Sequence, residues 1–421
     1  MKAIYPPSND VTLPHSSSYL GACKAFSSRS KTIMLTLGLF LSTLDSFHIA
    51  GASGAPLAAI GAILLAICCR KLRMPNHIDI VLFLIFMVGA FFGIYRASTT
   101  YIAEVKITNL IGWSIAGAVL LVDFEPYLDR IALAIRNTLL IHICFFLTQV
   151  LIYIVFAYYI DFCIYPFDCT MRYYEDFSFA HFSSPIGIRP TGLFEEPSNY
   201  ATFVLGLALL WYLQTRRVSL IVLLALLTAF LTFSSWSFGA IVFCVLFFSN
   251  TLKKWVLALM AIGTLYLLYF DWFWARTFVE TYETGQTPFI SRTDVATWII
   301  EQIGEAPWGT GIGVINRTLP NYILSLYDSG AALYFVYVFG VFGLMIAGLL
   351  LFSVNGLRRR LLMLFFLASK CSPVYPFFWI MVNLLRTTTT NESEVGSQRN
   401  ASGMGDVPMA IGKWGGRHRS P

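Results

Sequence analysis

Long apolar runs separated by short polar segments dominate this chain. Because about twenty apolar residues cross the hydrocarbon core of a bilayer, the pattern predicts a membrane span in each run. The expected spans are 31–50, 52–69, 78–96, 104–122, 138–160, 199–214, 218–235, 236–252, 255–271 and 330–352. A less regular run at 361–385 is interrupted by Lys370, Pro373 and Pro376, so it forms either one kinked span or a tight hairpin. We therefore expect an all-α, polytopic membrane protein of about 11–12 transmembrane helices.

Basic residues precede the first expected span and recur after every even-numbered one, which predicts the topology. The clusters contain Arg29 and Lys31, Arg70, Lys71 and Arg73, Arg130 and Arg136, Arg216 and Arg217, Lys253 and Lys254, and Arg358, Arg359 and Arg360. Since Lys and Arg accumulate in cytoplasmic loops, we expect the N-terminus in the cytoplasm. The two large hydrophilic loops, 161–198 and 272–329, then lie outside the cytoplasm, where no ATP or nucleotide sugar is present.

The composition agrees with a membrane protein and limits its partners. Hydrophobic residues make up 57% of the chain and charged residues 12%, whereas a soluble domain carries about 25% charged residues. The net charge of +6 lies in short loop clusters, not in a basic patch with interleaved aromatics, so we expect no nucleic-acid partner. The eight cysteines include no CxxC pair, and we expect no metal. Cys163 and Cys169 share the first outer loop and form either a disulfide or two free thiols.

Three regions follow from these patterns. Residues 1–30 are expected to form a cytoplasmic tail without a signal-peptide pattern, and residues 31–385 the membrane domain. Residues 386–421 are rich in Gly, Ser, Thr and Asn, so we expect a disordered tail. Within the membrane domain, residues 123–136 gather apolar residues on one helical face. That pattern is typical of a cytoplasmic interfacial helix or of an ordinary linker helix.

The segment 181–200 concentrates residues that a membrane core avoids. Its charged residues are Arg189, Glu195 and Glu196, its prolines are Pro185, Pro190 and Pro197, and its glycines are Gly187 and Gly192. Prolines prevent a continuous helix and glycines favour turns. The segment leads directly into the apolar run that begins at Asn199. We therefore expect a structured loop that folds back onto a membrane span.

A second polar segment lies in the loop 272–329. After Arg292 and a stretch of helical composition, Gly309, Gly311 and Gly313 predict a compact turn. Such a turn can direct backbone N–H groups at an anion, but a plain tight turn has the same sequence. No Gly-Lys-Ser/Thr follows, so the spacing is wrong for a nucleotide-binding P-loop.

The segment from Arg189 to Ala201 resembles the first outer-loop motif of the O-antigen polymerase and ligase superfamily. Ser291-Arg292 followed by Pro307-Trp-Gly-Thr-Gly-Ile-Gly313 resembles the second outer-loop motif of that superfamily. Ser329-Gly330 leading into Tyr337-Val-Phe-Gly-Val-Phe-Gly-Leu resembles its re-entry span. The resemblance covers roughly residues 30–385 and depends on the order, spacing and topology of the motifs together.

The resemblance implies a GT-C-like membrane glycosyltransferase of the bacterial inner membrane that needs no cofactor. Such a protein would transfer a glycan from undecaprenyl diphosphate at the periplasmic face. Its partners would be the lipid-linked glycan, membrane lipids and, in the same pathway, a chain-length regulator and a flippase. Ligases of the superfamily place a His in the second outer loop, and 272–329 contains none. We therefore expect a polymerase of O-antigen, capsule or exopolysaccharide, with a ligase as the alternative.

The reaction indicates which residues to expect in the site. A diphosphate leaving group needs positive charge more than a general acid, so we expect Arg189 and Arg292 to bind it. The acceptor hydroxyl needs a base or a hydrogen-bond partner, for which Glu195 and Glu196 are candidates and His181 a weaker one. Each of these charges has an alternative role in a structural ion pair. Gly192, Asn199 and the glycines of the turn are expected to contact substrate.

A protein of another class, a carrier or flippase of lipid-linked oligosaccharides, is the remaining alternative. Carriers place ionisable residues inside their spans and often contain internal repeats. Here the expected spans hold few such residues, among them Asp45, His48, Glu104, Lys106 and His142, and no repeat is evident. The pattern favours the enzyme.

Overall fold

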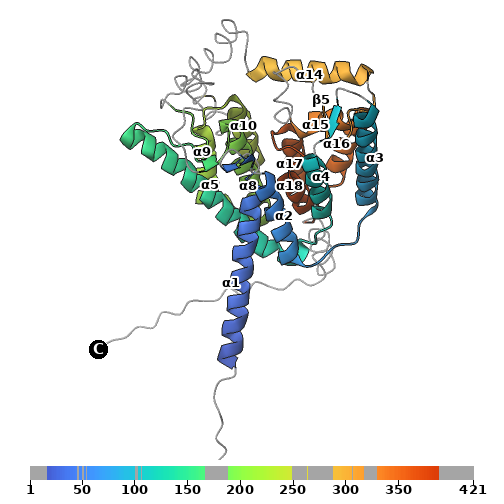
Figure 1. Cartoon of the computed structure of the whole chain (residues 1–421). Coiled ribbons are helices and arrows are strands. Elements are labelled where there is room, and N and C mark those ends of the chain that lie inside the picture. Colours follow the sequence, from blue (N-terminus) through green and yellow to red (C-terminus); the bar gives the residue numbers. More distant parts are fainter. Residues whose placement is uncertain are drawn as a thin grey trace, which may run out of the picture.

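A computed structural model describes residues 17–44, 47–49, 52–53, 55–99, 103–105, 107–165, 188–248, 263, 288–305, 307–316 and 330–387. Over these residues the fold is mostly α-helical (Figure 1), which confirms the helical part of the expected class. The helices are α1 Ser17–Ser42, α2 Ala55–Cys69, α3 His77–Thr99, α4 Ile107–Val119, α5 Leu128–Phe156, α8 Pro197–Thr215, α9 Leu220–Phe230, α10 Ser235–Phe248, α14 Pro288–Glu305, α15 Ala331–Phe339, α16 Val341–Phe352, α17 Leu357–Ala368 and α18 Pro376–Thr387.

Five short strands of two or three residues lie within the described part of the chain, and two of their three pairings join segments that are distant in the sequence. They are β1 His48–Ile49, β2 Ala52–Ser53, β3 Ala103–Val105, β4 Ile164–Tyr165 and β5 Val314–Asn316. Strand β1 pairs antiparallel with β2 and parallel with β4. Strand β3 pairs antiparallel with β5, so that Glu104 lies opposite Ile315. The apolar pattern did not predict these strands, because each is too short to show an alternation.

Helices α8 and α18 form the buried centre of the structure. Both bury side chains around their whole circumference, as expected for helices that other helices surround. The ring of Phe203 in α8 lies 4.7 Å from the ring of Phe377 in α18. Phe194, in the loop before α8, lies 5.0 Å from the same Phe203 ring. The polar loop that precedes α8 is therefore anchored in the central core.

Among the described residues, two helical stretches, His77–Arg96 and Glu125–Phe156, are long and apolar enough to cross a membrane. The apolar helices α2, α9, α10 and α16 are shorter than a full span. Several of the expected spans therefore correspond to helices that end before the apolar run does. The expected span 255–271 lies outside the described residues, apart from Gly263 in a helix.

The expected span 330–352 is divided into α15 and α16 at Gly340. This glycine has φ 58° and ψ −133°, a conformation that side chains other than glycine rarely adopt. A Cβ at this position would lie 1.9 Å from the carbonyl oxygen of Pro307. The Val341 N–H donates to that same carbonyl at 3.0 Å. The break is therefore set by close contact with the segment that follows α14.

Two other boundaries also differ from the apolar pattern. Residues 123–136 do not form a separate interfacial helix, because α5 continues without a break from Leu128 into the expected span 138–160 and ends at Phe156. The run 361–385 forms two helices, α17 and α18, joined by residues 369–375. Helix α18 includes Arg386 and Thr387, the first residues of the expected tail, and residues 388–421 lie outside the described residues.

Candidate functional site

Gln149 of α5 holds the polar loop 188–196 in place. Its side-chain Oε1 accepts the backbone N–H groups of Thr191 at 2.8 Å and Gly192 at 3.0 Å. Its Nε2 donates to the carbonyl oxygen of Ile160 at 2.6 Å. Gly192 has φ +60°, which permits the turn there. One fully buried amide thus supplies the hydrogen bonds that this turn would otherwise take from water.

The loop ends at the N-terminus of α8, where Glu196 is the N-cap residue. Its backbone is extended, with φ −127° and ψ 146°, and Pro197 follows at the first helical position. The carbonyl oxygen of Glu196 accepts the N–H groups of Asn199 and Tyr200. The side chain of Glu196 therefore lies at the N-terminus of α8, the helix end that favours negative charge.

Lys370 forms an ion pair with Glu196. It lies in the connection between α17 and α18, and its Nζ is 2.5 Å from Oε2 of Glu196. The same oxygen accepts a hydrogen bond from the Ser198 hydroxyl at 2.9 Å. The lysine side chain is only 8% exposed, whereas the glutamate side chain is 39% exposed. The carboxylate is thus the accessible member of the pair.

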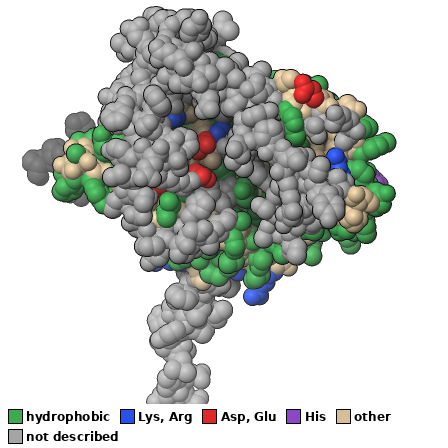
Figure 2. Space-filling view, turned by 45° about the horizontal axis from the view of Figure 1, so that its top comes forward, with side chains coloured by type: hydrophobic (Ala, Val, Ile, Leu, Met, Phe, Trp, Pro, Cys, Tyr) green, Lys and Arg blue, Asp and Glu red, His purple; other side chains and the backbone are tan. Residues whose placement is uncertain are grey.

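The charge of Arg189 also acts on Glu196. Burial raises the pKa of the Glu196 carboxyl, but Lys370, the Ser198 hydroxyl and Arg189 together lower that pKa below its ordinary value. Glu196 is therefore ionised at neutral pH. The structure brings two residues of the first outer-loop motif, Arg189 and Glu196, into one charged cluster with Lys370. Figure 2 shows basic and acidic side chains together in a hollow near the centre of the face that it brings forward.

The remaining expected residues of this loop lie beside the cluster or outside the described residues. Glu195 and Asn199 are half-buried, and no described residue donates a hydrogen bond to the buried Oδ1 of Asn199. Arg292 belongs to α14, but its side chain lies outside what the structure describes, as does the whole of His181. The expected pairing of Arg189 with Arg292 therefore stays a prediction.

The glycine turn packs against helices and does not direct the N–H groups of its centre outward. Gly309, Gly311 and Gly313 have φ values of +77°, +88° and +80°. The N–H groups of Thr310 and Gly311 donate to the carbonyls of Tyr337 and Val338 at the end of α15, and the N–H of Ile312 donates to Gly89 of α3. These donors are used within the protein, so the geometry matches the plain tight turn and not an anion cradle.

Arg96 of α3 completes the contacts of this turn. Its guanidinium donates to the carbonyl oxygen of Gly309 at 2.7 Å. A Cβ on Gly311 would lie 2.4 Å from the Cα of Gly93, so the turn approaches α3 at backbone distance. The glycines expected to contact substrate therefore have a packing role that explains them without a ligand.

Lys370 and Gln149 were not predicted from the sequence as residues of the site. Both carried a signal, because each is a polar residue inside an otherwise apolar run: Lys370 is the only charged residue of 361–385, and Gln149 lies within 138–160. Polar residues inside such runs usually face the protein interior and mark functional or structural contacts. Their partners could not be identified, since Lys370 and Glu196 are 174 positions apart.

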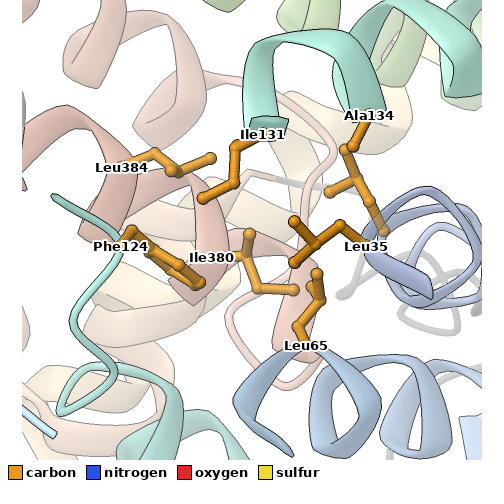
Figure 3. A pocket seen from close by; sticks show the side chains of 8 residues that line it. Leu35, Leu65, Phe124, Ile131, Ala134, Ile380 and Leu384 are labelled. Atoms are coloured by element: carbon orange, nitrogen blue, oxygen red, sulfur yellow. The ribbon is translucent and has the colours of Figure 1, made fainter. Parts of the chain in front are cut away.

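An apolar cavity lies apart from the charged cluster, between α1, α2, α5 and α18. Figure 3 shows the side chains that line it pointing toward one another. The lining residues are Leu35, Leu39, Leu65, Phe124, Ile131, Ala134, Ile380 and Leu384. No polar group faces this cavity, so it does not suit a charged or sugar ligand.

Within the described ranges, no group of three or more His, Cys, Asp or Glu side chains is arranged to hold a metal ion. Cys163 is buried, and Cys169, with which it shares the first outer loop, lies outside those ranges, so the choice between a disulfide and two thiols stays a prediction. Comparison of the chain with protein-family models, with curated proteins and with solved structures finds no match in any of the three.

Proposed function

We propose that this chain is an integral-membrane polysaccharide polymerase. It joins undecaprenyl-diphosphate-linked repeat units of O-antigen, capsule or exopolysaccharide at the periplasmic face of the bacterial inner membrane. The observation that carries the proposal is the cluster of Arg189, Glu196 and Lys370 at the N-terminus of α8. It combines cations for a diphosphate with a carboxylate for an acceptor hydroxyl, in a chain that is otherwise apolar.

The apolar surface supports a membrane location. Large apolar side chains are exposed along α3 and along the second half of α5, for example Phe91 at 67% and Phe156 at 72%. Soluble monomers rarely expose contiguous apolar patches of this kind. Hydrocarbon around these helices would remove the unfavourable contact of the exposed side chains with water.

The two ends of α3 support the expected topology. Asp79, near the start of α3, binds Arg73 of the first basic loop, whereas Arg96 near the end binds Gly309 of the second outer loop. These two positions are about 26 Å apart along a helix that rises 1.5 Å per residue. A basic cytoplasmic loop and an outer loop thus contact opposite ends of one candidate span.

In this topology α17 and α18 form a hairpin that does not cross the membrane. Helix α17 follows Gly356 and begins with the basic cluster, and Arg386 at the end of α18 contacts Asp79 at the expected cytoplasmic end of α3. Each helix has 12 residues, about 18 Å, which is less than the hydrocarbon core of about 30 Å. The connection with Lys370 then lies at the outer loop that contains Glu196, and Thr387 lies toward the cytoplasmic side.

In this proposal Arg189 and Arg292 stabilise the charge that develops on the diphosphate. Glu196 or Glu195 accepts the proton of the attacking sugar hydroxyl. The diphosphate leaves without protonation because it is already a weak base. No step requires a nucleotide or a metal ion.

Deletion of the gene tests the proposal against its alternatives. Loss of an O-antigen polymerase leaves single repeat units on lipid A core. Loss of a ligase leaves long lipid-linked chains unattached, and loss of a flippase traps repeat units in the cytoplasmic leaflet. Reporter fusions within 161–198 and 272–329 test the topology, and reporters on opposite sides of the membrane would exclude the proposed site.

Substitution of the arginines tests the site itself. We expect Arg189→Ala and Arg292→Ala to abolish chain growth without lowering the amount of protein in the membrane. Arg217→Ala, on an exposed residue of the loop before α9, is the matched control and should retain activity. Full chain growth in the first two variants would exclude diphosphate binding by these residues.

One observation favours the carrier alternative. Helix α5 buries Thr138, His142 and Gln149 inside a candidate span, and His142 Nε2 lies 2.8 Å from the hydroxyl of Thr43, the residue after α1. Polar residues buried inside membrane spans are common along transport pathways. Trapping of repeat units in the cytoplasmic leaflet after gene deletion would support this reading over the polymerase.

A further inference from the structure

We infer that Lys370 is an exchangeable counter-ion. It pairs with Glu196 until the lipid-linked donor arrives, and it then binds the donor diphosphate and frees Glu196 to act as the base. This inference rests on the proposed function and deepens it, because it names the donor diphosphate as the group that activates the site.

The position of Lys370 is difficult to explain by stability alone. Its side chain is 8% exposed, and it forms an ion pair with a carboxylate that is 174 positions away in the sequence. A buried ion pair repays the loss of hydration only partly, and apolar side chains of similar volume often stabilise a protein equally well. A methionine would suit the apolar stretch 361–385 better than a charged residue, so the charge itself indicates a function.

The geometry allows the ammonium group to change partners. Glu196 Oε2 already accepts a second hydrogen bond from Ser198, so the carboxylate keeps a partner when Lys370 leaves. The charge of Arg189 acts on the same carboxylate. A diphosphate with two or more negative charges therefore attracts both cations more strongly than one carboxylate does. Lysine suits this exchange because its ammonium has three donors on a flexible stem.

The exchange would change the basicity of Glu196. Burial is the largest influence on its pKa and raises it, whereas Lys370 is the largest influence that lowers it. While the pair exists, Glu196 is a weak base. When Lys370 binds the diphosphate, the effect of burial remains and the pKa of Glu196 rises. The carboxylate becomes a better proton acceptor at the moment when the donor is present.

These groups account for each bond and each proton in the glycosyl transfer step. The acceptor hydroxyl oxygen forms a bond to the anomeric carbon of the donor, and its proton moves to the Glu196 carboxylate. The bond between the anomeric carbon and the diphosphate oxygen breaks, and its electron pair leaves with undecaprenyl diphosphate. Release of that product returns Lys370 to Glu196, which passes its proton to water.

The test follows the titration of Glu196 by infrared difference spectroscopy on the full chain in lipid nanodiscs. The Glu196→Gln variant identifies the infrared band of the Glu196 carboxyl, because that band is absent from its spectrum. We expect undecaprenyl diphosphate to move the titration of the wild-type carboxyl to higher pH. Undecaprenol, which has the same tail without the diphosphate, should leave the titration unchanged. A titration that does not move although undecaprenyl diphosphate binds would overturn the inference, as would the absence of binding.

Variants of the lysine give an independent readout. In Lys370→Met the Glu196 titration should lie at higher pH without any lipid, and undecaprenyl diphosphate should move it less than in the wild type, because only the charge of Arg189 remains to be drawn away. Lys71→Met, which removes a lysine from the ion pair with Asp123, should behave as wild type. If Lys370→Met does not fold, the wild-type measurement with the two lipids still decides.

Failure of the inference and failure of the proposed function are distinguishable. If gene deletion blocks chain growth but undecaprenyl diphosphate does not change the Glu196 titration, the polymerase proposal stands and the inferred exchange of Lys370 is wrong. If deletion leaves chain growth intact, the proposed function is wrong, and the inferred exchange of Lys370 is then wrong as well.

Discussion

Arg386 of α18 forms an ion pair with Asp79 of α3, with its Nη1 2.5 Å from Oδ1. Arg73 binds the same carboxylate oxygen at 3.0 Å. Asn76 caps the start of α3, since its Oδ1 accepts the Asp79 N–H at 2.9 Å and its own N–H donates to Asp79. Burial, and then the charge of Arg386, lower the pKa of Arg73, while Asp79 raises it. One carboxylate thus joins two guanidinium groups from distant parts of the chain.

Removal of that carboxylate charge should destabilise the protein strongly. Asp79→Asn leaves Arg386 buried without its counter-ion, so we expect the free energy of unfolding to fall by about 3–5 kcal/mol. Chemical denaturation in detergent micelles measures this change. Lys71→Met is the control: the Lys71 side chain is 65% exposed in its pair with Asp123, and we expect a change within about 1 kcal/mol. Equal stability of Asp79→Asn and wild type would contradict the structural role.

Gln149 should be necessary for the loop that contains Arg189. Gln149→Leu removes the partner of two backbone N–H groups and one carbonyl. Each unsatisfied buried group costs about 1–3 kcal/mol, so we expect a loss of about 2 kcal/mol or more in the free energy of unfolding. Chain growth should also fall, because the position of Arg189 depends on this loop.

Gln214 provides a matched control for that substitution. Its side-chain amide atoms are buried in α8, and no described residue forms a hydrogen bond with them. Gln214→Leu should therefore leave stability unchanged or increase it. Thermal unfolding of both variants, compared with the wild type, distinguishes a specific anchor from a general effect of burying leucine.

Gly340 should tolerate no side chain. Gly340→Ala places a Cβ against the Pro307 carbonyl at a positive φ, and we expect a loss of about 3 kcal/mol or more from strain and overpacking. Gly348→Ala in α16 is the control, because a Cβ there meets nothing within 4 Å. That variant should remain within about 1 kcal/mol of wild type. A stable Gly340→Ala would mean that the break between α15 and α16 does not depend on the glycine.

The ion pair between Glu196 and Lys370 should depend on pH in one direction. The folded protein lowers the pKa of Glu196 below its ordinary value of 4.5. The stability that this pair contributes is therefore present above pH 4.5 and is lost as the pH falls through the folded-state pKa. The difference in thermal stability between wild type and Glu196→Gln should stay constant through neutral pH and decrease in acid. A difference that changes near neutral pH would contradict the lowered pKa.

Chain growth should respond to the same residue. Glu196→Gln keeps the shape of the side chain but cannot accept a proton, and general bases contribute about 100-fold or more to rates. We expect Glu196→Gln to reduce polymer yield by that order, whereas Glu195→Gln should reduce it less if Glu196 is the base. Polymer length ladders from complemented deletion strains measure both variants. Equal loss in the two variants would assign the role to the pair and not to Glu196.

The helical character of the chain and the polar, turn-rich nature of the loop before α8 could be predicted from local sequence patterns. Apolar runs and turn residues are local patterns, so they show where helices form and where Pro197 and Gly192 end or redirect the backbone. The same patterns overestimated the length of several helices. A run such as 330–352 remains apolar across Gly340, and hydropathy does not register a break that backbone packing imposes.

The contacts between polar residues depend on the packing of the helices and could not be predicted from the sequence. Lys370 with Glu196, Gln149 with Gly192, and Arg386 with Asp79 are pairs separated by 174, 43 and 307 positions. No local pattern specifies such partners, because they depend on how whole helices pack around α8 and α18. For the same reason the glycine turn could not be assigned from its spacing: its N–H groups bind Tyr337, Val338 and Gly89, which lie on other helices.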